Sequence, residues 1–212
     1  MALKRKPRIA TPGPILSPNL PNDDFTLTAA LYFDSIEHYA AAREAELRGD
    51  TQLYDRYKRS SVLAALSFFE AQLNSLAFSY AVARKEDLGQ IELDALEEME
   101  TQLDDRGDIV RKSKFYRTES RFCLLAYILS GKDFDRGGSL WQRFGDARKI
   151  RDRWTHPKPP FDTWSLELKN VRDAIVVVYD MYQKLAEMMD SNLPAWMRPV
   201  DEILNEIEQN AG

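Results

Sequence analysis

The chain has 212 residues, of which 44% are hydrophobic and 30% charged, a composition that excludes a disordered protein and favours one main globular domain. Its formal charge of −5 argues against a protein that coats nucleic acid with its whole surface. No apolar run approaches the roughly 20 residues that a membrane span needs. We therefore expect a soluble protein without a membrane partner.

The first 24 residues are predicted to form an extended, flexible N-terminal arm. Five prolines within this stretch prevent a helix, and the basic start is not followed by the apolar core of a signal peptide. The single cysteine, Cys123, lies in an apolar run and is expected to be a small core residue. Because one cysteine cannot form an intrachain disulfide, a reducing cytoplasm is the expected location.

Helical spacing of apolar residues predicts two long helices in the first half of the chain. The first covers residues 25–48 and ends at Gly49, and Asp50 is expected to cap the second, which continues to about Lys85. The acidic stretch from Ile91 to Leu103 predicts a short solvated helix, since its carboxylates outnumber its apolar positions. Solubility is the expected role of those carboxylates.

The second half predicts three further helices and a terminal one. Thr118 is expected to cap a helix that ends at Gly131, and Ser139 to cap a helix through Thr155. A long amphipathic helix follows over residues 165–190, and residues 199–209 predict a terminal helix packed on the bundle. No segment predicts a strand. The expected fold is an all-α, antiparallel bundle of five to seven helices over residues 25–190, with residues 191–212 as a C-terminal accessory segment.

The most unusual local feature is the basic stretch RKIRDRWTHPKPP, residues 148–160. Pro157 disfavours helical geometry in the residue before it, so His156 is expected at a helix C-terminus, where the dipole favours the imidazolium. Arg151 could hold a phosphate and stabilise transition-state charge while His156 transfers protons. Four further cations could contact an RNA backbone: Arg148, Lys149, Arg153 and Lys158.

A simpler interpretation stays open, because basic residues in a last helical turn complement the dipole and a histidine there can cap carbonyl groups. A metal site is not expected, since the two histidines, His38 and His156, lie far apart in the sequence. With RNA no metal or other cofactor is needed, because the ribose 2′-hydroxyl can itself be the nucleophile.

These residues resemble the HEPN family of helical domains. Its motif is an arginine, a polar residue and then a histidine near the end of a late helix, as in RDRWTH with Arg151, Asp152 and His156. The run SSVLAALSFFEAQLNSLAF is similar to the long early helix of that family, with Glu70 and Asn74 four residues apart. The resemblance covers roughly residues 25–190.

The resemblance implies a homodimer that brings two motifs to a shared cleft and cleaves RNA without metal, as a toxin or defence effector with a possible antitoxin or regulatory protein as partner. Arg151 and His156 would be catalytic, and Asp152 would orient one of them or polarise the site. Because Glu70 and Asn74 share a helix face, they could brace the motif helix. Other members of the family are inactive, so a helical interaction or nucleotide-binding module is the alternative.

Overall fold

The structure is a computed structural model, and it describes residues 27–155 and 166–210. The predicted arm over residues 1–24 therefore lies outside the described residues. Within the described ranges the chain forms seven helices and one two-stranded sheet, which confirms the predicted helical bundle. Their order is α1 (Leu27–Leu47), α2 (Thr51–Ala83), α3 (Gln90–Leu96), β1 (Met99–Leu103), β2 (Ile109–Ser113), α4 (Thr118–Ser130), α5 (Ser139–Thr155), α6 (Leu168–Met188) and α7 (Val200–Asn210).

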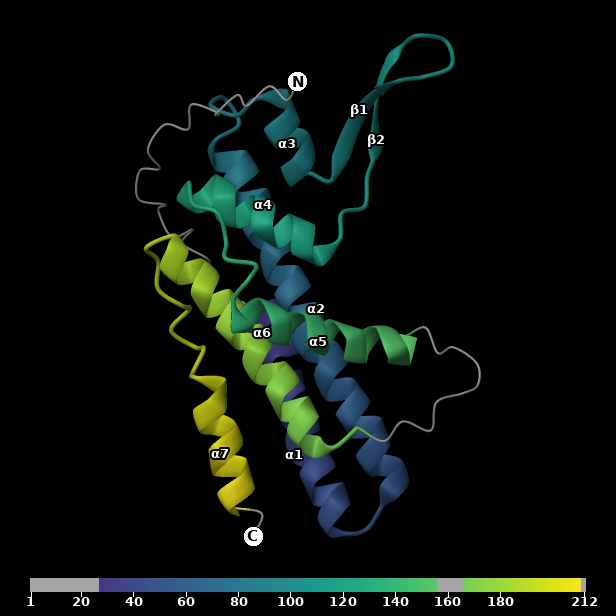
Figure 1. The fold of residues 1–212 in the computed structure, drawn as a ribbon, viewed down its shortest axis with the longest axis vertical. Coiled ribbons are helices and arrows are strands. Elements are labelled where there is room, and N and C mark those ends of the chain that lie inside the picture. The colour runs from purple at the N-terminus through teal and green to yellow at the C-terminus, as the bar shows by residue number, and fades with distance from the viewer. Residues whose placement is uncertain (1–26, 156–165, 211–212) are drawn as a thin grey trace.

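Helix α2 runs along the long axis of the molecule, and the other helices are arranged around it (Figure 1). Helices α1 and α6 lie along its lower half, α5 crosses it near the middle, and α4 and α3 lie toward its upper end. Helix α7 packs against α1 and α6, with Val200 and Leu204 in the core. The predicted terminal helix is therefore present and shares the main hydrophobic core.

The helix boundaries follow the expected local chemistry at most ends. The Asp50 carboxylate accepts a hydrogen bond of 3.0 Å from the backbone N–H of Leu53, which confirms the predicted cap of α2. Gly131 ends α4 in the left-handed conformation at φ 70°. The predicted cap at Thr118 is wrong, because Arg117 is the N-cap residue and Thr118 is the first residue of the helix. The Thr118 hydroxyl instead donates to Glu70 on α2 at 2.8 Å.

Three phenylalanines join α2, α4 and α5 at the centre of the core. Phe69, Phe122 and Phe144 are all fully buried. The ring centroid of Phe69 lies 5.7 Å from that of Phe122 and 5.0 Å from that of Phe144. Edge and tilted ring contacts at such distances are worth about 0.5–1.5 kcal/mol beyond the apolar area that they bury. This cluster sets where α5 crosses α2.

The acidic stretch departs from its prediction in its second half. Only α3 is helical, and residues 99–113 form an antiparallel hairpin in which Met99 pairs with Ser113 and Leu103 with Ile109. Gly107 supplies the positive φ of 84° that the turn requires. The prediction that no segment forms a strand is therefore wrong for residues 99–113, because a glycine turn lets two short segments pair in place of the expected helix.

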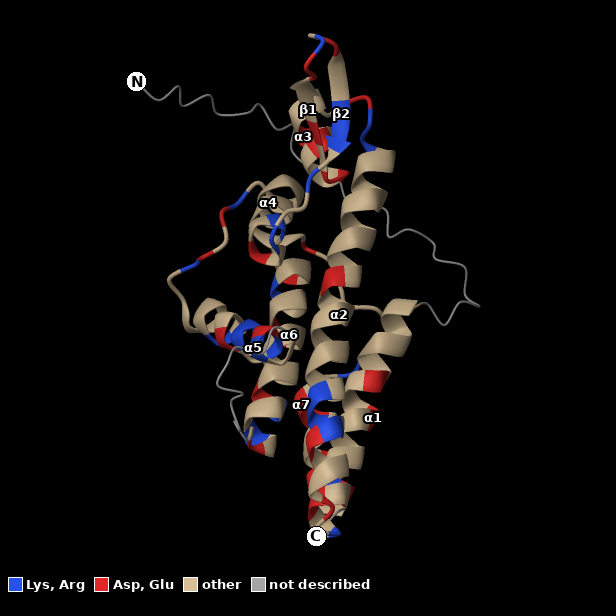
Figure 2. Cartoon of the chain, turned by 90° about the vertical axis from the view of Figure 1, so that its right-hand side faces the viewer, with Lys and Arg blue, Asp and Glu red and all other residues tan. Residues whose placement is uncertain are grey.

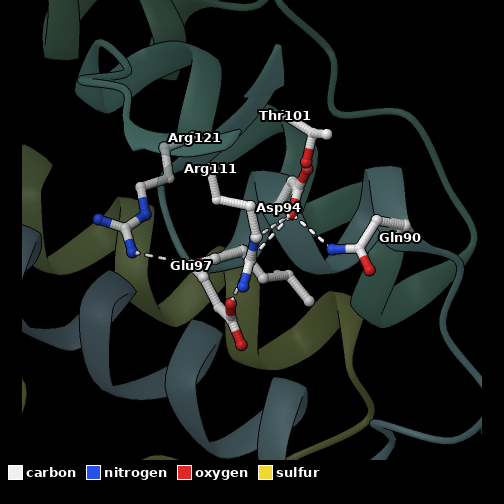
Figure 3. Close-up of polar contacts among 7 residues, drawn as sticks. Gln90, Asp94, Glu97, Thr101, Arg111 and Arg121 are labelled. Atoms are coloured by element: carbon white, nitrogen blue, oxygen red, sulfur yellow. Dashed lines mark hydrogen bonds and ion pairs between the residues drawn. The ribbon is translucent and has the colours of Figure 1, made fainter. Parts of the chain in front are cut away.

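One of the acidic residues is a buried anchor rather than a solvated charge. Asp94 is only 7% exposed and accepts hydrogen bonds from Gln90 at 2.7 Å, Thr101 at 2.5 Å and Arg111 at 2.8 Å. Figure 3 shows these side chains pointing toward its carboxylate, with Arg111 also reaching Glu97. Asp94 thus ties α3 to one residue of each strand and sets how the hairpin leaves the helical body.

By length and composition, α2 is the one helix in the described ranges that could cross a membrane, but 56% of its most apolar 18-residue window is buried against the rest of the protein. Core helices commonly pass the same test. The length and composition of α2 therefore fit a core helix as well as a membrane span.

We predict that Asp94→Asn lowers the melting temperature at neutral pH, and that this difference disappears in acid. The hydrogen bond from Thr101 does most to lower the pKa of Asp94, with Gln90 and Arg111 adding to it against the effect of burial. A lowered pKa contributes stability above the unfolded value, about 3.9, which is lost as the pH falls through the folded value. Thermal melts of both proteins from pH 7 to pH 2 measure it.

Asp105→Asn is the matched control, since Asp105 is an exposed residue of the hairpin turn. Its difference from wild type should stay small at every pH. A constant difference for Asp94→Asn over the whole range would show that the carboxylate charge does not contribute to the anchor.

Candidate functional site

Helix α5 carries the basic motif, and apolar contacts on one of its faces orient it. Phe144 and Ala147 are buried against the core, whereas Lys149 and Arg153 are exposed. Figure 2 shows the Lys and Arg positions of α5 gathered where the helix crosses the body, with Asp and Glu positions close to them. The hydrophobic spacing therefore turns one side of the basic helix inward and leaves the other side accessible.

Arg151 lies at the junction of α5 with α2. Its Nη1 is 3.4 Å from the Glu70 carboxylate on α2, and its Nε is 3.0 Å from the carboxylate of Asp152. The Arg151 side chain keeps 23% of its area exposed. Nη1 donates to Glu70, whereas the buried Nε has no hydrogen-bond partner among the described residues although the Asp152 carboxylate is close. A guanidinium has five N–H donors, so Arg151 can offer further donors to a ligand.

Glu70 is the connecting residue of this junction, because it receives groups from two other helices. It accepts the Thr118 hydroxyl of α4 and pairs with Arg151 of α5 through the same oxygen, Oε1. The structure therefore brings Glu70 to the motif helix, as its position on α2 suggested. Asn74 lies elsewhere: its carboxamide oxygen accepts a hydrogen bond from Arg121 on α4, and Arg121 also pairs with Glu98 at 3.0 Å.

Arg148 is more deeply placed than Arg151 and is engaged inside the protein. Its side chain is 15% exposed and forms an ion pair with Glu119 on α4. Burial lowers the pKa of Arg148 from its usual value, while the nearby Asp152 carboxylate opposes this change and the Arg151 guanidinium adds to it. Arg148 therefore ties α5 to α4. The sequence had suggested it as a contact to an RNA backbone, which would require an exposed side chain.

The remaining predicted residues are divided between exposed positions and positions outside the described residues. The Lys149 side chain is 76% exposed and pairs with Asp146 at 2.7 Å, and Asp152 is half exposed. Arg153 is exposed as well. His156 and Lys158 lie outside the described residues.

Both described residues that flank the segment 156–165 are held by polar contacts. The Thr155 hydroxyl donates to the backbone carbonyl of Arg151 at 3.1 Å. On the other side, Lys58 of α2 donates to the carbonyl of Leu166 at 2.5 Å. Lys58 is 1% exposed and also pairs with Asp55 at 2.8 Å, so a fully buried ammonium ties the chain before α6 to α2.

A pocket of about 650 Å³ is lined by residues of other elements than the motif helix α5. It is lined by Tyr39, Arg43, Glu46, Tyr54, Glu167, Leu168, Lys169, Arg172 and Glu208. Its arginines already pair with carboxylates, as Arg172 does with Asp201 at 2.5 Å. Because these arginines are already paired, the pocket is a weaker candidate for an anion site than the basic motif.

Within the described ranges no three His, Cys, Asp or Glu side chains gather as a metal site would require. Cys123 is half-buried against the core, and burial raises the pKa of its thiol. A raised pKa disfavours the reactive thiolate, in line with the expected packing role.

No protein-family model, curated protein or solved structure matches this chain. The HEPN resemblance therefore stays a prediction that depends on the residues quoted for it.

In the described part of the site Arg148, Lys149 and Arg151 each have a carboxylate of the same chain as partner. Thr118 and Glu119 complete this site. The sequence predicted Thr118 as a helix cap and indicated no role for Glu119. Glu119 follows the cap residue Arg117 closely, where an acidic residue is expected to favour the helix dipole. No spacing rule links it to Arg148 on a different helix, so this contact could not be found from the sequence.

We predict that Glu119→Ala lowers the free energy of unfolding by about 1–3 kcal/mol, because it leaves the mostly buried Arg148 without its partner. Urea denaturation followed by circular dichroism measures the change. Asp146→Ala is the matched control on the exposed Lys149 pair, and its effect should stay within about 0.5 kcal/mol. Equal losses in the two variants would contradict an internal role for the Arg148 pair.

Proposed function

We propose that this chain is a metal-independent endoribonuclease of HEPN type that acts as a toxin or defence effector. The observation that carries the proposal is the position of Arg151, which is held by Glu70 and Asp152 yet keeps part of its guanidinium exposed at the end of a basic helix. A charged, oriented donor of this kind suits the extra negative charge of a phosphodiester transition state. The next residue beyond the described part of α5 is His156.

In the proposed reaction the ribose 2′-oxygen attacks the adjacent phosphorus and the bond to the 5′-oxygen breaks, which leaves a cyclic phosphate. His156 takes the proton of the 2′-hydroxyl or supplies one to the leaving 5′-oxygen. Arg151 stabilises the phosphoryl oxygens, and Asp152 orients its guanidinium through the contact at Nε. The exposed cations Lys149 and Arg153, with Lys158, would hold the neighbouring phosphates.

A homodimer in which two motifs face one cleft belongs to this proposal, as does a regulatory partner such as an antitoxin. An unregulated ribonuclease would damage its host, so an acidic or motif-covering partner is the expected means of control. The proposed place of action is the cytoplasm, where RNA substrates are abundant.

A second candidate, a non-catalytic interaction module, is favoured by a different observation. Arg148 and Arg151 each pair with a carboxylate on another helix of the same chain. Such pairs are also what three packed helices need in order to bury their charged side chains. In this alternative Arg151 and His156 shape an interface or bind a nucleotide, and their loss would change association or stability.

We predict that the purified protein cleaves RNA in the presence of EDTA, and that Arg151→Ala and His156→Ala each reduce the rate by roughly 10²-fold or more. A fluorescent RNA and denaturing gels measure cleavage, and the cyclic phosphate end is identified by mass spectrometry. Lys184→Ala, which changes an exposed lysine on α6 paired with Glu187, is the control and should retain full activity.

Circular dichroism establishes that each variant is folded. If varied RNAs stay intact with the wild-type protein, and the two motif variants alter sedimentation or melting, the interaction module is the better description. Cleavage that EDTA abolishes would contradict the metal-independent mechanism while leaving a nuclease in place.

A further inference from the structure

The β1–β2 hairpin extends away from the helical body and has no third strand beside it in the described part of the chain (Figure 1). The strand pair next to its charged turn is apolar and exposed: Leu103 is 68% exposed and its cross-strand partner Ile109 is 77% exposed. An isolated two-stranded hairpin is marginally stable in water and gains from an additional strand. This element is therefore incomplete as a sheet.

Hydrogen bonds at the two ends of the hairpin show which backbone groups face outward. The N–H of Lys114 donates to the carbonyl of Glu98 at 2.7 Å, and the N–H of Asp104 donates to the carbonyl of Asp108 at 2.9 Å. Antiparallel pairs alternate between bonded and non-bonded positions. The even-numbered residues of β1 therefore bond to β2, and Met99, Thr101 and Leu103 turn their N–H and C=O groups to the open edge.

Helix α3 covers a face of the hairpin and leaves that edge open. Asp94 contacts Thr101 of β1 and Arg111 of β2 together, and these two residues are cross-strand partners. A group that reaches both strands lies above the sheet. Among the described residues no backbone bond reaches the outward groups of β1 from another element.

The two edges of the hairpin differ in charge. Strand β2 carries Arg111 and Lys112, and basic side chains are a common device that keeps an edge strand from pairing. Strand β1 has neither a basic residue nor a proline. Its one charge, Glu100, is paired with Lys114 at 2.6 Å. The edge of β1 is therefore the one that is open to pairing.

We propose that β1 pairs antiparallel with β1 of a second copy of this chain and forms a four-stranded sheet across a twofold axis. The strand sequence METQL suits this arrangement. Centred on Thr101, the register places Thr101 opposite Thr101, Met99 opposite Leu103 and Glu100 opposite Gln102 of the other copy. The outward groups then form about six intermolecular backbone hydrogen bonds, and threonine pairs are favourable across strands.

The same register accounts for the exposure of the Leu103–Ile109 pair. Leu103 would lie between Ile109 of its own chain and Met99 of the second copy, so a continuous apolar row forms on one face of the sheet. The two Glu100 carboxylates lie diagonally across the axis, and each has its own Lys114 as partner. Within the strands Met99–Leu103 the interface therefore buries apolar surface without setting like charges opposite each other. Just beyond them Glu98 of each copy comes near Asp104 of the other, and Glu98 keeps Arg121 as its partner at 3.0 Å.

Two other pairings through the hairpin are disfavoured by charge or by symmetry. A twofold pairing of β2 with β2 centred on Arg111 places two arginines directly opposite each other, which is destabilising. Pairing of β1 with β2 of another copy is head-to-tail, and such contacts form open filaments unless the rotation closes. Only the β1 pairing gives a closed dimer with matched residues, and it does not depend on the proposed nuclease activity.

The test is the association state of the full chain, measured by sedimentation equilibrium, with a proline placed on each edge in turn. Leu103→Pro removes an outward N–H of β1 without removing a bond to β2, and we expect it to shift the protein to monomers. Ile109→Pro is the matched control, since Ile109 is the partner of Leu103 and its N–H faces the other edge. We expect this variant to remain dimeric.

Two charge substitutions at Gln102 give a second test that leaves the backbone hydrogen bonds intact. Gln102→Glu places like charges opposite Glu100 of the second copy at two symmetric positions, and we expect roughly fivefold weaker dimerisation. Gln102→Lys creates two opposite-charge pairs and should strengthen the dimer by a similar factor. Both effects should decrease at high salt.

Each other outcome overturns the proposal. A wild-type protein that is monomeric at high micromolar concentration has no such interface. A dimer that survives Leu103→Pro uses another surface, and a dimer lost only with Ile109→Pro uses the edge of β2. Large assemblies that both prolines dissolve are head-to-tail filaments. Since none of these measurements uses RNA, loss of the nuclease proposal and loss of this one are distinguishable.

Discussion

The contact between the Glu70 carboxylate and the Arg151 guanidinium is the interaction on which the arrangement of the motif helix depends. Phe69 and Glu70 are neighbours on α2, and both contact α4 and α5. Phe69 packs against the phenylalanines of α4 and α5, whereas Glu70 accepts the Thr118 hydroxyl and pairs with Arg151. The apolar contact brings the three helices together, and the polar contact beside it selects their rotation.

This pairing of an apolar and a polar contact explains why α5 can carry so many cations and still pack. An arginine that loses most of its water costs free energy unless a carboxylate replaces that water. Glu70 and Glu119 supply those carboxylates from α2 and α4. The acidic character of the chain is thus partly an internal requirement of its basic helix.

The sequence was sufficient for features that depend on neighbours along the chain. The cap at Asp50 and the glycine end of α4 follow from local backbone chemistry, and the helical periodicity predicted the bundle. The hairpin was missed because its anchor is tertiary: Asp94 and Arg111 are 17 residues apart. A carboxylate that accepts several hydrogen bonds looks the same in sequence as a solvated one, so composition alone assigned it to the surface.

For the site, spacing found Glu70 because two residues four apart share a helix face, but the same reasoning assigned Asn74 to the same task. The structure gives Asn74 to Arg121 of α4 instead, one helical turn beyond Glu70, where α4 and α5 both meet α2. The ion pairs have a further consequence for any anionic ligand. A phosphate at Arg151 must compete with Glu70 and Asp152, which stand within 3.4 Å and 3.0 Å of it. A ligand that contacts several cations at once gains more than a single small anion, so under the nuclease proposal the expected ligand is a polyanion rather than free phosphate.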